Sequence, residues 1–371
     1  MILLLHHRYR HAGGEERAVA DLAWLIREHL GEEVEVLQRD SATVGGARAA
    51  AGLLRGGLDP RAVAQAVERT GARVVHAHNL QPTYGWRALA AARRAGARTV
   101  LHLHNYRLVC AVGTCFTHGE DCTRCHGVDT LPGLRHNCRG SRAEAAAYAA
   151  GLALGQRRIA AAADAFLVPS AFALGRLRAL GAPLGDRARV LPSVQREFAP
   201  SSTAVHGRYV LAAGRLAPEK GFADAVEACA RAGLPLVVAG DGPQSAALRA
   251  HAVKLGAEVR FPGRVDAETL AVLRHGAAVA VVPSRYAEIL PLAALEAMAA
   301  GLPVVAARSG GLTEAVPGEG LYAPGDVAAL ADRLRALWRD PAAGERALAA
   351  ARALSAPDVV ASGLAAVYDG S

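Results

Sequence analysis

The sequence predicts an α/β protein in which two doubly wound parallel sheets follow one another along the chain. Short apolar runs alternate with alanine-rich stretches that favour helix, which is the rhythm of βαβ units. This rhythm stops in one proline- and serine-rich segment, 192–207, and then starts again. With 371 residues, 52% of them hydrophobic, the chain is long enough for two domains of ordinary size.

The first domain is expected to span 1–191. Its apolar runs predict strands at 1–5, 33–37, 73–77, 98–103, 165–168 and 188–191. The stretches between them predict helices at 15–30, 59–70, 86–95, 141–162 and 171–180.

The second domain is expected to span 208–355, after the linker 192–207. Its strands are predicted at 209–213, 235–239, 258–261, 278–282 and 303–306. Its helices are predicted at 221–232, 243–255, 267–275, 290–300 and 326–339, and the segment 356–371 adds one more short helix. Ligands of such sheets bind outside the carboxyl ends of the strands, so we expect the two domains to face a common cleft.

Charge and hydropathy exclude some classes of protein. No apolar stretch approaches the ~20 residues that cross a bilayer, and the apolar start MILLLHH is too short for a signal peptide, so we expect a cytoplasmic protein. Residues 1–200 hold 26 arginines against 17 acidic residues, a net charge of about +9. This excess could serve an anionic acceptor, a membrane surface or nucleic acid, but scattered arginines and few aromatic residues favour a solvated surface.

The stretch LLLHHRYRHAGGEERAV, 3–19, runs from a strand through a basic loop into a helix. Gly13 and Gly14 lie where that helix would expose unpaired amides, which attract anions such as phosphate. The alternative is a tight turn that binds nothing.

Two cations follow the first strand of the second domain in GRLAPEKG, 214–221. Arg215 can hold phosphate oxygens with two donors and Lys220 adds a point charge, so the pair could neutralise a diphosphate. Lys220 is one of only two lysines in the chain, which makes its position less easily explained by chance.

Two carboxylates, Glu288 and Glu296, lie in the segment AEILPLAALEAMAAGLPVVAARSGGLTE, 287–314. At this spacing one could accept from sugar hydroxyls and the other from ribose hydroxyls; otherwise Glu288 compensates a helix dipole and Glu296 is solvated. Gly310 and Gly311 follow a strand and precede a helical turn, and offer a second set of amides.

These motifs, in this order, resemble a known family. GGEER near the start, GRLAPEKG, AGDGP at 239–243, the two glutamates with AAGLPVVA, and SGGLTE are similar to the retaining, nucleotide-sugar-dependent glycosyltransferases of family 4. The resemblance covers nearly the whole chain. It implies the GT-B fold of two Rossmann-like domains, with the terminal helix crossing back to the first domain.

The resemblance also implies the roles of particular residues in donor binding. Arg215 and Lys220 would hold the diphosphate, Glu296 the ribose and Glu288 the transferred sugar. The other implied donor contacts are Gly13, Gly14, Gly242, Arg264, Leu290, Leu292, Gly310 and Gly311. Leu290 stands where the family usually has glycine, which weakens any inference about the donor sugar.

The first domain would hold the acceptor. LHLHNYRLVC, 101–110, ends a strand, and His104 is the histidine closer to its carboxyl end. In the family a histidine at this place contacts the donor sugar, so we take His104 with Arg215, Lys220 and Glu288 as the catalytic set. Arg10, His104, Asn105 and Tyr106 are taken as acceptor contacts.

Five of the six cysteines fall within 110–138. Four thiolates in a segment with little apolar content suggest a structural zinc knuckle, for which we favour Cys110, Cys122, Cys125 and Cys138. Cys115 would be spare, although His118, His126 or His136 could replace a cysteine. Unligated thiols, an iron–sulfur centre and disulfides are the alternatives. A similar insertion occurs in some bacterial members of the family, and its position suggests a wall of the acceptor pocket.

We therefore expect a retaining glycosyltransferase of the hexosyltransferase class that uses a nucleoside diphosphate sugar, such as UDP-GlcNAc or UDP-glucose. Its acceptor would be a hydroxyl of a small molecule or glycan, in antibiotic or cell-surface glycan biosynthesis, with at most peripheral membrane contact. No catalytic metal is expected, because the mechanism that the resemblance implies requires none, and the chain has no Asp-x-Asp motif. The alternatives are a catalytically silent nucleotide-sugar-binding protein and a zinc-knuckle protein that binds nucleic acid.

Overall fold

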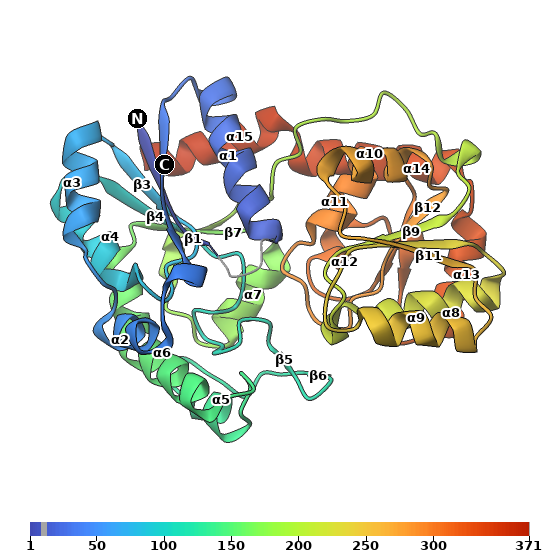
Figure 1. The fold of residues 1–371 in the computed structure, drawn as a ribbon. Helices are drawn as coiled ribbons and strands as arrows, with labels where there is room; N and C mark the ends of the chain where they lie inside the picture. Colours follow the sequence, from blue (N-terminus) through green and yellow to red (C-terminus); the bar gives the residue numbers. More distant parts are fainter. Residues whose placement is uncertain (9–12, 371) are drawn as a thin grey trace. The chain divides into compact units, whose positions relative to one another are not determined.

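The structure is a computed structural model that describes residues 1–8 and 13–370. The chain forms two compact units (Figure 1). The first unit comprises Met1–Thr117, Cys122–Val194 and Pro357–Ser371, and the second comprises His118–Asp121 and Gln195–Ala356. Residues 192–207, expected as a linker, contain a single short 3-10 helix, Ala204–His206, and no α-helix or strand.

The first unit contains a parallel six-stranded sheet in the order β2-β1-β3-β4-β7-β8. Its strands are β1 (Ile2–Arg8), β2 (Val34–Asp40), β3 (Val74–Ala77), β4 (Arg98–His102), β7 (Ala165–Val168) and β8 (Ala188–Val190). All six strands predicted for this half are confirmed. The order changes direction between β1 and β3, so the sheet is doubly wound with a switch point there.

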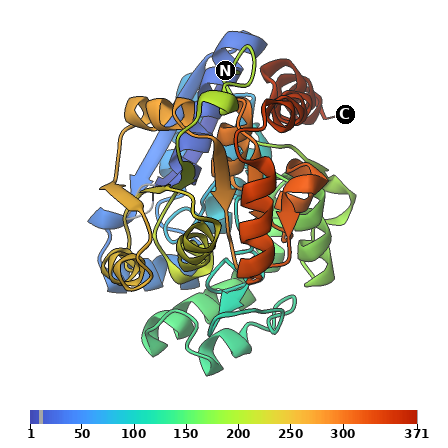
Figure 2. The same cartoon turned by 90° about the vertical axis from the view of Figure 1, so that its right-hand side faces the viewer.

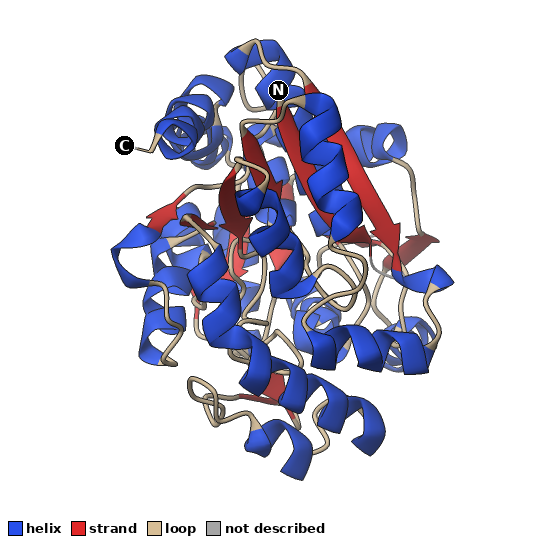
Figure 3. Ribbon diagram, turned by 90° about the vertical axis from the view of Figure 1, so that its left-hand side faces the viewer, coloured by secondary structure: helices blue, strands red, loops and turns tan. Residues whose placement is uncertain are grey.

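The helices of the first unit are distinguished from its strands by colour in Figure 3. They are α1 (Gly14–Leu30), α2 (Gly46–Arg55), α3 (Arg61–Thr70), α4 (Gly85–Arg94), α5 (Leu131–Arg135), α6 (Arg142–Ala162), α7 (Ala171–Ala179) and α15 (Pro357–Asp369). The sequence analysis missed α2 and α5. Helix α5 has only five residues, whereas α2 was missed although its length and apolar period match those of the predicted helix α3.

The second unit, whose strands are coloured from yellow-green to orange in Figure 2, contains a second parallel sheet, in the order β11-β10-β9-β12-β13-β14. Its strands are β9 (Val210–Ala213), β10 (Leu236–Ala239), β11 (Val259–Gly263), β12 (Val279–Val282), β13 (Val304–Ala307) and β14 (Leu321–Tyr322). All five predicted strands are confirmed, and the two-residue β14 was missed. This order is the one found in dinucleotide-binding folds, with the switch point between β9 and β12.

Helices cover both faces of the second sheet, which explains why its four inner strands, β10, β9, β12 and β13, are apolar at every position. The helices are α8 (Phe222–Ala232), α9 (Ser245–Lys254), α10 (Ala267–His275), α11 (Leu292–Ala299), α12 (Leu312–Ala315), α13 (Val327–Leu337) and α14 (Pro341–Ser355). Val210 and Ala212 point into a core with α8 and α13, whereas Leu211 points into a second core with α11 and α14. Such two-sided burial is typical of parallel sheets.

Helix α14 was not predicted, although the residues at its start carry known start signals of a helix. Asp340 accepts a hydrogen bond from the amide of Ala343, and Pro341 occupies the first helical position. Both features are standard start signals of a helix.

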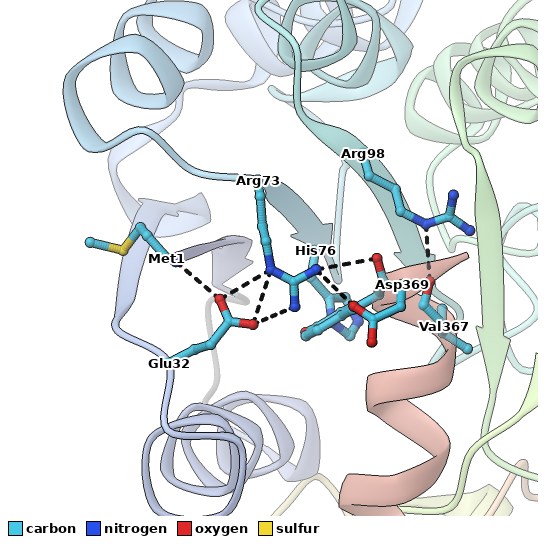
Figure 4. Close-up of polar contacts among 8 residues, drawn as sticks. Met1, Glu32, Arg73, His76, Arg98, Val367 and Asp369 are labelled. Atoms are coloured by element: carbon cyan, nitrogen blue, oxygen red, sulfur yellow. Dashed lines mark hydrogen bonds and ion pairs between the residues drawn. The ribbon is translucent and has the colours of Figure 1, made fainter. Parts of the chain in front are cut away.

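The last helix, α15, packs in the first unit beside α1. Val360, Leu364 and Val367 of α15 share one core with Leu22 and Ile26 of α1, over the β1–β3–β4 face of the sheet. Polar contacts fix its end, as shown in Figure 4. Arg73 donates to the carboxylate of Asp369 at 3.1 Å and Arg98 donates to the carbonyl of Val367 at 3.0 Å.

Candidate functional site

The switch point of the second sheet brings together two loops that carry predicted site residues. The loop after β9 contains Arg215 and Lys220, and the loop after the neighbouring strand β12 contains Glu288. The two loops touch through their backbones: a Cβ at Gly221 would lie 2.0 Å from the carbonyl oxygen of Pro283. The sequence placed these residues on separate motifs, and the topology brings them together.

Lys220 and Glu288 form an ion pair. The ammonium Nζ lies 2.6 Å from Oε1 of Glu288 and 3.3 Å from the hydroxyl of Tyr286. The Glu288 side chain is 6% exposed and that of Lys220 25% exposed. Burial disfavours the ammonium, but the adjacent carboxylate outweighs this cost and raises the pKa of Lys220 above its usual value. Lys220 is therefore a fixed positive charge at neutral pH.

Two hydroxyls hold the Glu288 carboxylate in place. Ser284 donates to Oε1 at 2.5 Å, and Tyr286 donates to Oε2 at 2.9 Å. Burial, followed by the charge of Glu288, raises the pKa of Tyr286, so its phenol stays protonated and remains a donor. Sequence reasoning missed Ser284 and Tyr286; their only signal was their position in the loop after a buried strand.

The backbone of Glu288 is fixed by the glycines of the SGG motif. A Cβ at Gly310, whose φ is +61°, would lie 2.1 Å from the carbonyl oxygen of Glu288. That carbonyl accepts a hydrogen bond from the amide of Gly311 at 2.8 Å. In this structure, therefore, the Gly311 amide positions Glu288.

The arginines near this pair are both bound to carboxylates. Arg215 forms an ion pair with Glu219, and its side chain is half exposed. Arg285, which the sequence analysis did not single out, donates to both oxygens of Asp224 at 2.9 and 2.5 Å. The amide of Arg285 also donates to the carbonyl of Glu219 at 2.9 Å, which ties the two loops together.

Glu296 lies on α11 and forms an ion pair with Arg274 of α10. Both side chains are 11% exposed. The predicted ribose contact is therefore held by a basic partner that the sequence analysis missed.

The remaining predicted donor residues lie on neighbouring loops of the second unit. Gly242 follows β10, and a Cβ there would lie 2.5 Å from the carbonyl oxygen of Leu216. Close backbone packing therefore explains why this residue is a glycine. Arg264 follows β11 and is exposed, and Leu290 and Leu292 are partly exposed beside the start of α11.

The start of α1 holds its own carboxylate in the structure. The amide of Gly13 donates to Oε2 of Glu16 at 2.6 Å, and Gly14 is the first residue of the helix. This contact caps the helix end that the sequence analysis assigned to phosphate. Arg10 lies outside the described residues.

In the first unit, histidines gather on one face of the sheet near its carboxyl end. His104 follows β4, and its Nε2 lies 2.8 Å from Nδ1 of His78, which follows β3. The rings of His76 and His102 stack beside them, with His102 and His104 4.1 Å apart between ring centroids. Burial lowers the pKa of His102 to about 3 and those of His76, His78 and His104 well below the usual value. These imidazoles are neutral.

This histidine face borders a small cavity of about 10 Å³, which accommodates the centre of a water molecule. His78, His102 and His104 line the cavity together with residues of α1, α15 and the segment 191–194. Sequence reasoning identified His102 and His104 but missed His76 and His78. The alternation in VVHAHN, 74–79, was the available signal, because it matches that of LHLHN on the adjacent strand.

Asn105 and Tyr106 shape the loop after His104. Oδ1 of Asn105 accepts from the amide of Arg107 at 2.9 Å. Tyr106 is only 1% exposed, so its ring is buried beneath the loop surface and helps to hold the loop in place.

The four predicted metal ligands, Cys110, Cys122, Cys125 and Cys138, line one cavity of the first unit. The structure has all six cysteines as free thiols, and Cys115 is buried. None of the described helices is both long enough and apolar enough to span a bilayer.

Two family models match the chain. Residues 7–193 match the model described as "Glycosyl transferase 4-like domain", which covers half of the chain. Residues 194–354 match the model described as "Glycosyl transferases group 1".

Curated relatives match over part of their length. Glycogen synthase of Mycobacterium tuberculosis is 42% identical over 173 residues, which are 43% of this chain and 42% of that protein. The 2-deoxystreptamine glucosyltransferase of Streptomyces kanamyceticus is 38% identical over 139 residues, 35% of this chain and 36% of that protein. The chain thus spans less than half the length of these relatives.

Solved structures match over the whole chain and show the fold. Sucrose-phosphate synthase from Thermosynechococcus elongatus has a TM-score of 0.70 at 21% identity and covers 99% of this chain, with 98% of its own length covered. HepE of Anabaena, in complex with UDP and glucose, has a TM-score of 0.68 at 18% identity, with coverage of 100% and 99%. The fold is therefore GT-B, and the chain belongs to the glycosyltransferases of the 4-like and group 1 type.

Proposed function

We propose that the protein is a retaining glycosyltransferase that transfers a sugar from a nucleoside diphosphate sugar to a hydroxyl acceptor. The observation that carries this proposal is the Lys220–Glu288 pair at the switch point of the second sheet. A partly buried cation beside an oriented carboxylate provides one group for a diphosphate and one for sugar hydroxyls.

The contacts of Lys220 leave capacity for a phosphate oxygen. An ammonium has three N–H donors. Among the described residues, the ammonium of Lys220 donates to Glu288 and Tyr286. Arg215 lies in the same loop with its guanidinium half exposed, and would add a planar, two-donor contact. Together they would stabilise the charge that develops on the leaving diphosphate.

Glu288 is arranged to accept rather than to donate. Its two oxygens are held by Ser284, Tyr286 and Lys220, so the carboxylate is fixed before any ligand arrives. The remaining lone pairs can accept hydrogen bonds from hydroxyls of the transferred sugar. We assign the ribose to Glu296, whose geometry is fixed by Arg274.

A uridine nucleotide is the donor class that we favour. HepE, a structural neighbour, has been solved with UDP and with UDP-glucose. GDP-mannose is the competing class, because a mannosyltransferase of Corynebacterium glutamicum described as GDP-mannose-dependent is 34% identical over 140 residues. The acceptor would be held by the first unit, at His104 and Asn105.

A panel of nucleotide sugars tests the proposal. UDP-glucose, UDP-GlcNAc, GDP-mannose and ADP-glucose would each be added to the full chain in a thermal-shift assay. A ligand at about 100 times its Kd stabilises the folded protein by about 2.7 kcal/mol, which is a readily measured shift. Stabilisation by UDP sugars supports the proposal, and no response to any nucleotide sugar contradicts it. Slow hydrolysis of the stabilising donor without acceptor would separate an enzyme from a silent binding protein, the alternative that Leu290 suggests.

A further inference from the structure

Four cysteines from separate parts of the segment 110–138 meet at one cavity of the first unit. Cys110, Cys122, Cys125 and Cys138 line it with Phe116, Thr117, Pro132 and Gly133 among others. The cavity has a volume of about 10 Å³, which is room for one small ion. The cavity is therefore small, and its lining is rich in sulfur.

One basic side chain lies at the cavity. Arg124 lines it and donates a hydrogen bond to the sulfur of Cys122 at 3.4 Å. A positive charge beside a thiolate stabilises its negative charge.

The segment has little other means of holding its conformation. Between His104 and α6, its regular structure consists of two strands of two residues each and the five-residue helix α5. Cys115, His118 and Asn137 adopt positive φ, a conformation that non-glycine residues rarely hold without restraint. Small segments without an apolar core usually depend on a metal or disulfides.

We propose that Cys110, Cys122, Cys125 and Cys138 bind one structural zinc ion. Four thiolates with no open position are a common ligand set of structural zinc, with Zn–S distances of about 2.3 Å. Their soft sulfur ligands favour zinc over magnesium or calcium. Binding would draw the sulfurs together around the ion.

The histidine face is the competing site, and its geometry opposes metal binding. Among the described residues, His76, His78 and His102 are the trio with ligand atoms all within 4.8 Å of one another. However, Nδ1 of His76 contacts the Tyr368 hydroxyl at 2.7 Å, and Nδ1 of His78 contacts His104. The rings of His76 and His78 are also within 11° of parallel, so their in-plane lone pairs do not converge on one point.

Two other candidate ligands of the segment do not line the cavity. Cys115 is absent from the lining. Nε2 of His126 lies 3.1 Å from the carbonyl of Ala179, so this ring is used elsewhere. His136 lines the cavity, so a test must compare its substitution with those of the four cysteines.

The ion would hold the loop that carries the acceptor residues. The amide of Cys110 donates to the carbonyl of Tyr106 at 2.8 Å, and the amide of Tyr106 donates to the carbonyl of Gly113 at 2.9 Å. A metal fixed to Cys110 would therefore stabilise the turn that follows His104 and Asn105. Its role would be structural, separate from the donor site.

Metal analysis of the full chain tests this inference. Protein purified without chelators should contain about one zinc ion per chain, measured by inductively coupled plasma mass spectrometry. Cys122→Ser and Cys125→Ser should each abolish that zinc. Cys229→Ser, on α8 of the second unit, Cys115→Ser and His136→Gln are the matched controls and should retain it.

Cobalt substitution keeps the inference testable if the serine variants fail to fold. Replacing the wild-type ion with Co²⁺ should give the intense visible absorption of a tetrahedral thiolate site. No metal, iron with acid-labile sulfide, or disulfides among these cysteines would each overturn the zinc assignment. Loss of zinc in His136→Gln would overturn the four-cysteine ligand set.

Discussion

The ammonium of Lys220 and the carboxylate of Glu288, 68 positions apart in the sequence, lie 2.6 Å from each other in the second unit. The two residues come from the loops that follow adjacent strands at the sheet's switch point. This pairing fixes both groups before a ligand arrives, and it makes Lys220 the first residue to test.

Lys220→Met should reduce turnover by about 10² to 10³-fold, because it removes a preorganised charge from the leaving diphosphate. Lys254→Met is a matched control, since Lys254 is the other lysine of the chain and is exposed at the end of α9. Initial rates with a saturating donor measure the effect, with thermal unfolding recorded to detect loss of fold. Equal rates in the two variants would reject the phosphate role of Lys220.

Glu288→Gln should separate recognition of the sugar from recognition of the nucleotide. The amide keeps the size of the side chain and can still accept from Ser284, but it removes the negative charge that sugar hydroxyls would meet. We expect affinity for UDP to change by less than about tenfold, while kcat falls by about 10² or more. Calorimetric titration with UDP and a rate assay provide the two readings. A variant that loses UDP affinity but keeps kcat would contradict the assignment.

Gly310→Ala should damage the site through the backbone. The new Cβ would meet the carbonyl of Glu288 at 2.1 Å, in a left-handed conformation that alanine disfavours. We expect a loss of unfolding free energy on the order of 1–3 kcal/mol and a fall in kcat. Gly318→Ala is the matched control, because its Cβ would meet nothing within 4 Å. Equal stability and activity in the two variants would show that Gly310 does not position Glu288.

Acid should destabilise the first unit through its buried histidines. Burial lowers the pKa of His7 to about 4 and that of His102 to about 3, whereas unfolded histidine takes up a proton near pH 6.5. Below about pH 6.5 the unfolded chain therefore binds more protons, so stability falls as the pH falls, by about 1.4 kcal/mol per pH unit for each such histidine.

His102→Leu should reduce that slope by about one histidine's contribution between pH 6.5 and about pH 5. The leucine also removes two ring nitrogens that have no hydrogen-bond partner among the described residues. His206→Gln, at an exposed position of the second unit, is the control variant. Urea unfolding at a series of pH values measures it, and identical slopes in wild type and His102→Leu would refute the account.

The fold could be predicted because its strands are short, apolar and separated by turns. Parallel strands buried on both faces leave this pattern in the sequence, and eleven of the twelve strands of the two main sheets were identified within a few residues. Elements too short to show such a pattern were missed: β14 has two residues and α5 has five. Helix α14 was missed although Asp340 and Pro341 mark its start.

The candidate site could be predicted only in part. Motifs identified Lys220 and Glu288 as separate residues, but their contact depends on which strands are neighbours, which the sequence does not state. Partners that have no motif, such as Arg274 and Tyr286, come from other elements or loops and were not foreseeable. The four cysteines were identified as candidate metal ligands from their residue type and spacing, and that assignment stays a prediction.

Hydrogen exchange of the full chain with and without UDP tests most directly whether the donor binds beside Lys220 and Glu288. The account predicts that UDP slows exchange mainly in peptides that cover 214–222 and 283–296. Protection confined to the first unit, or no protection at saturating UDP, would contradict it.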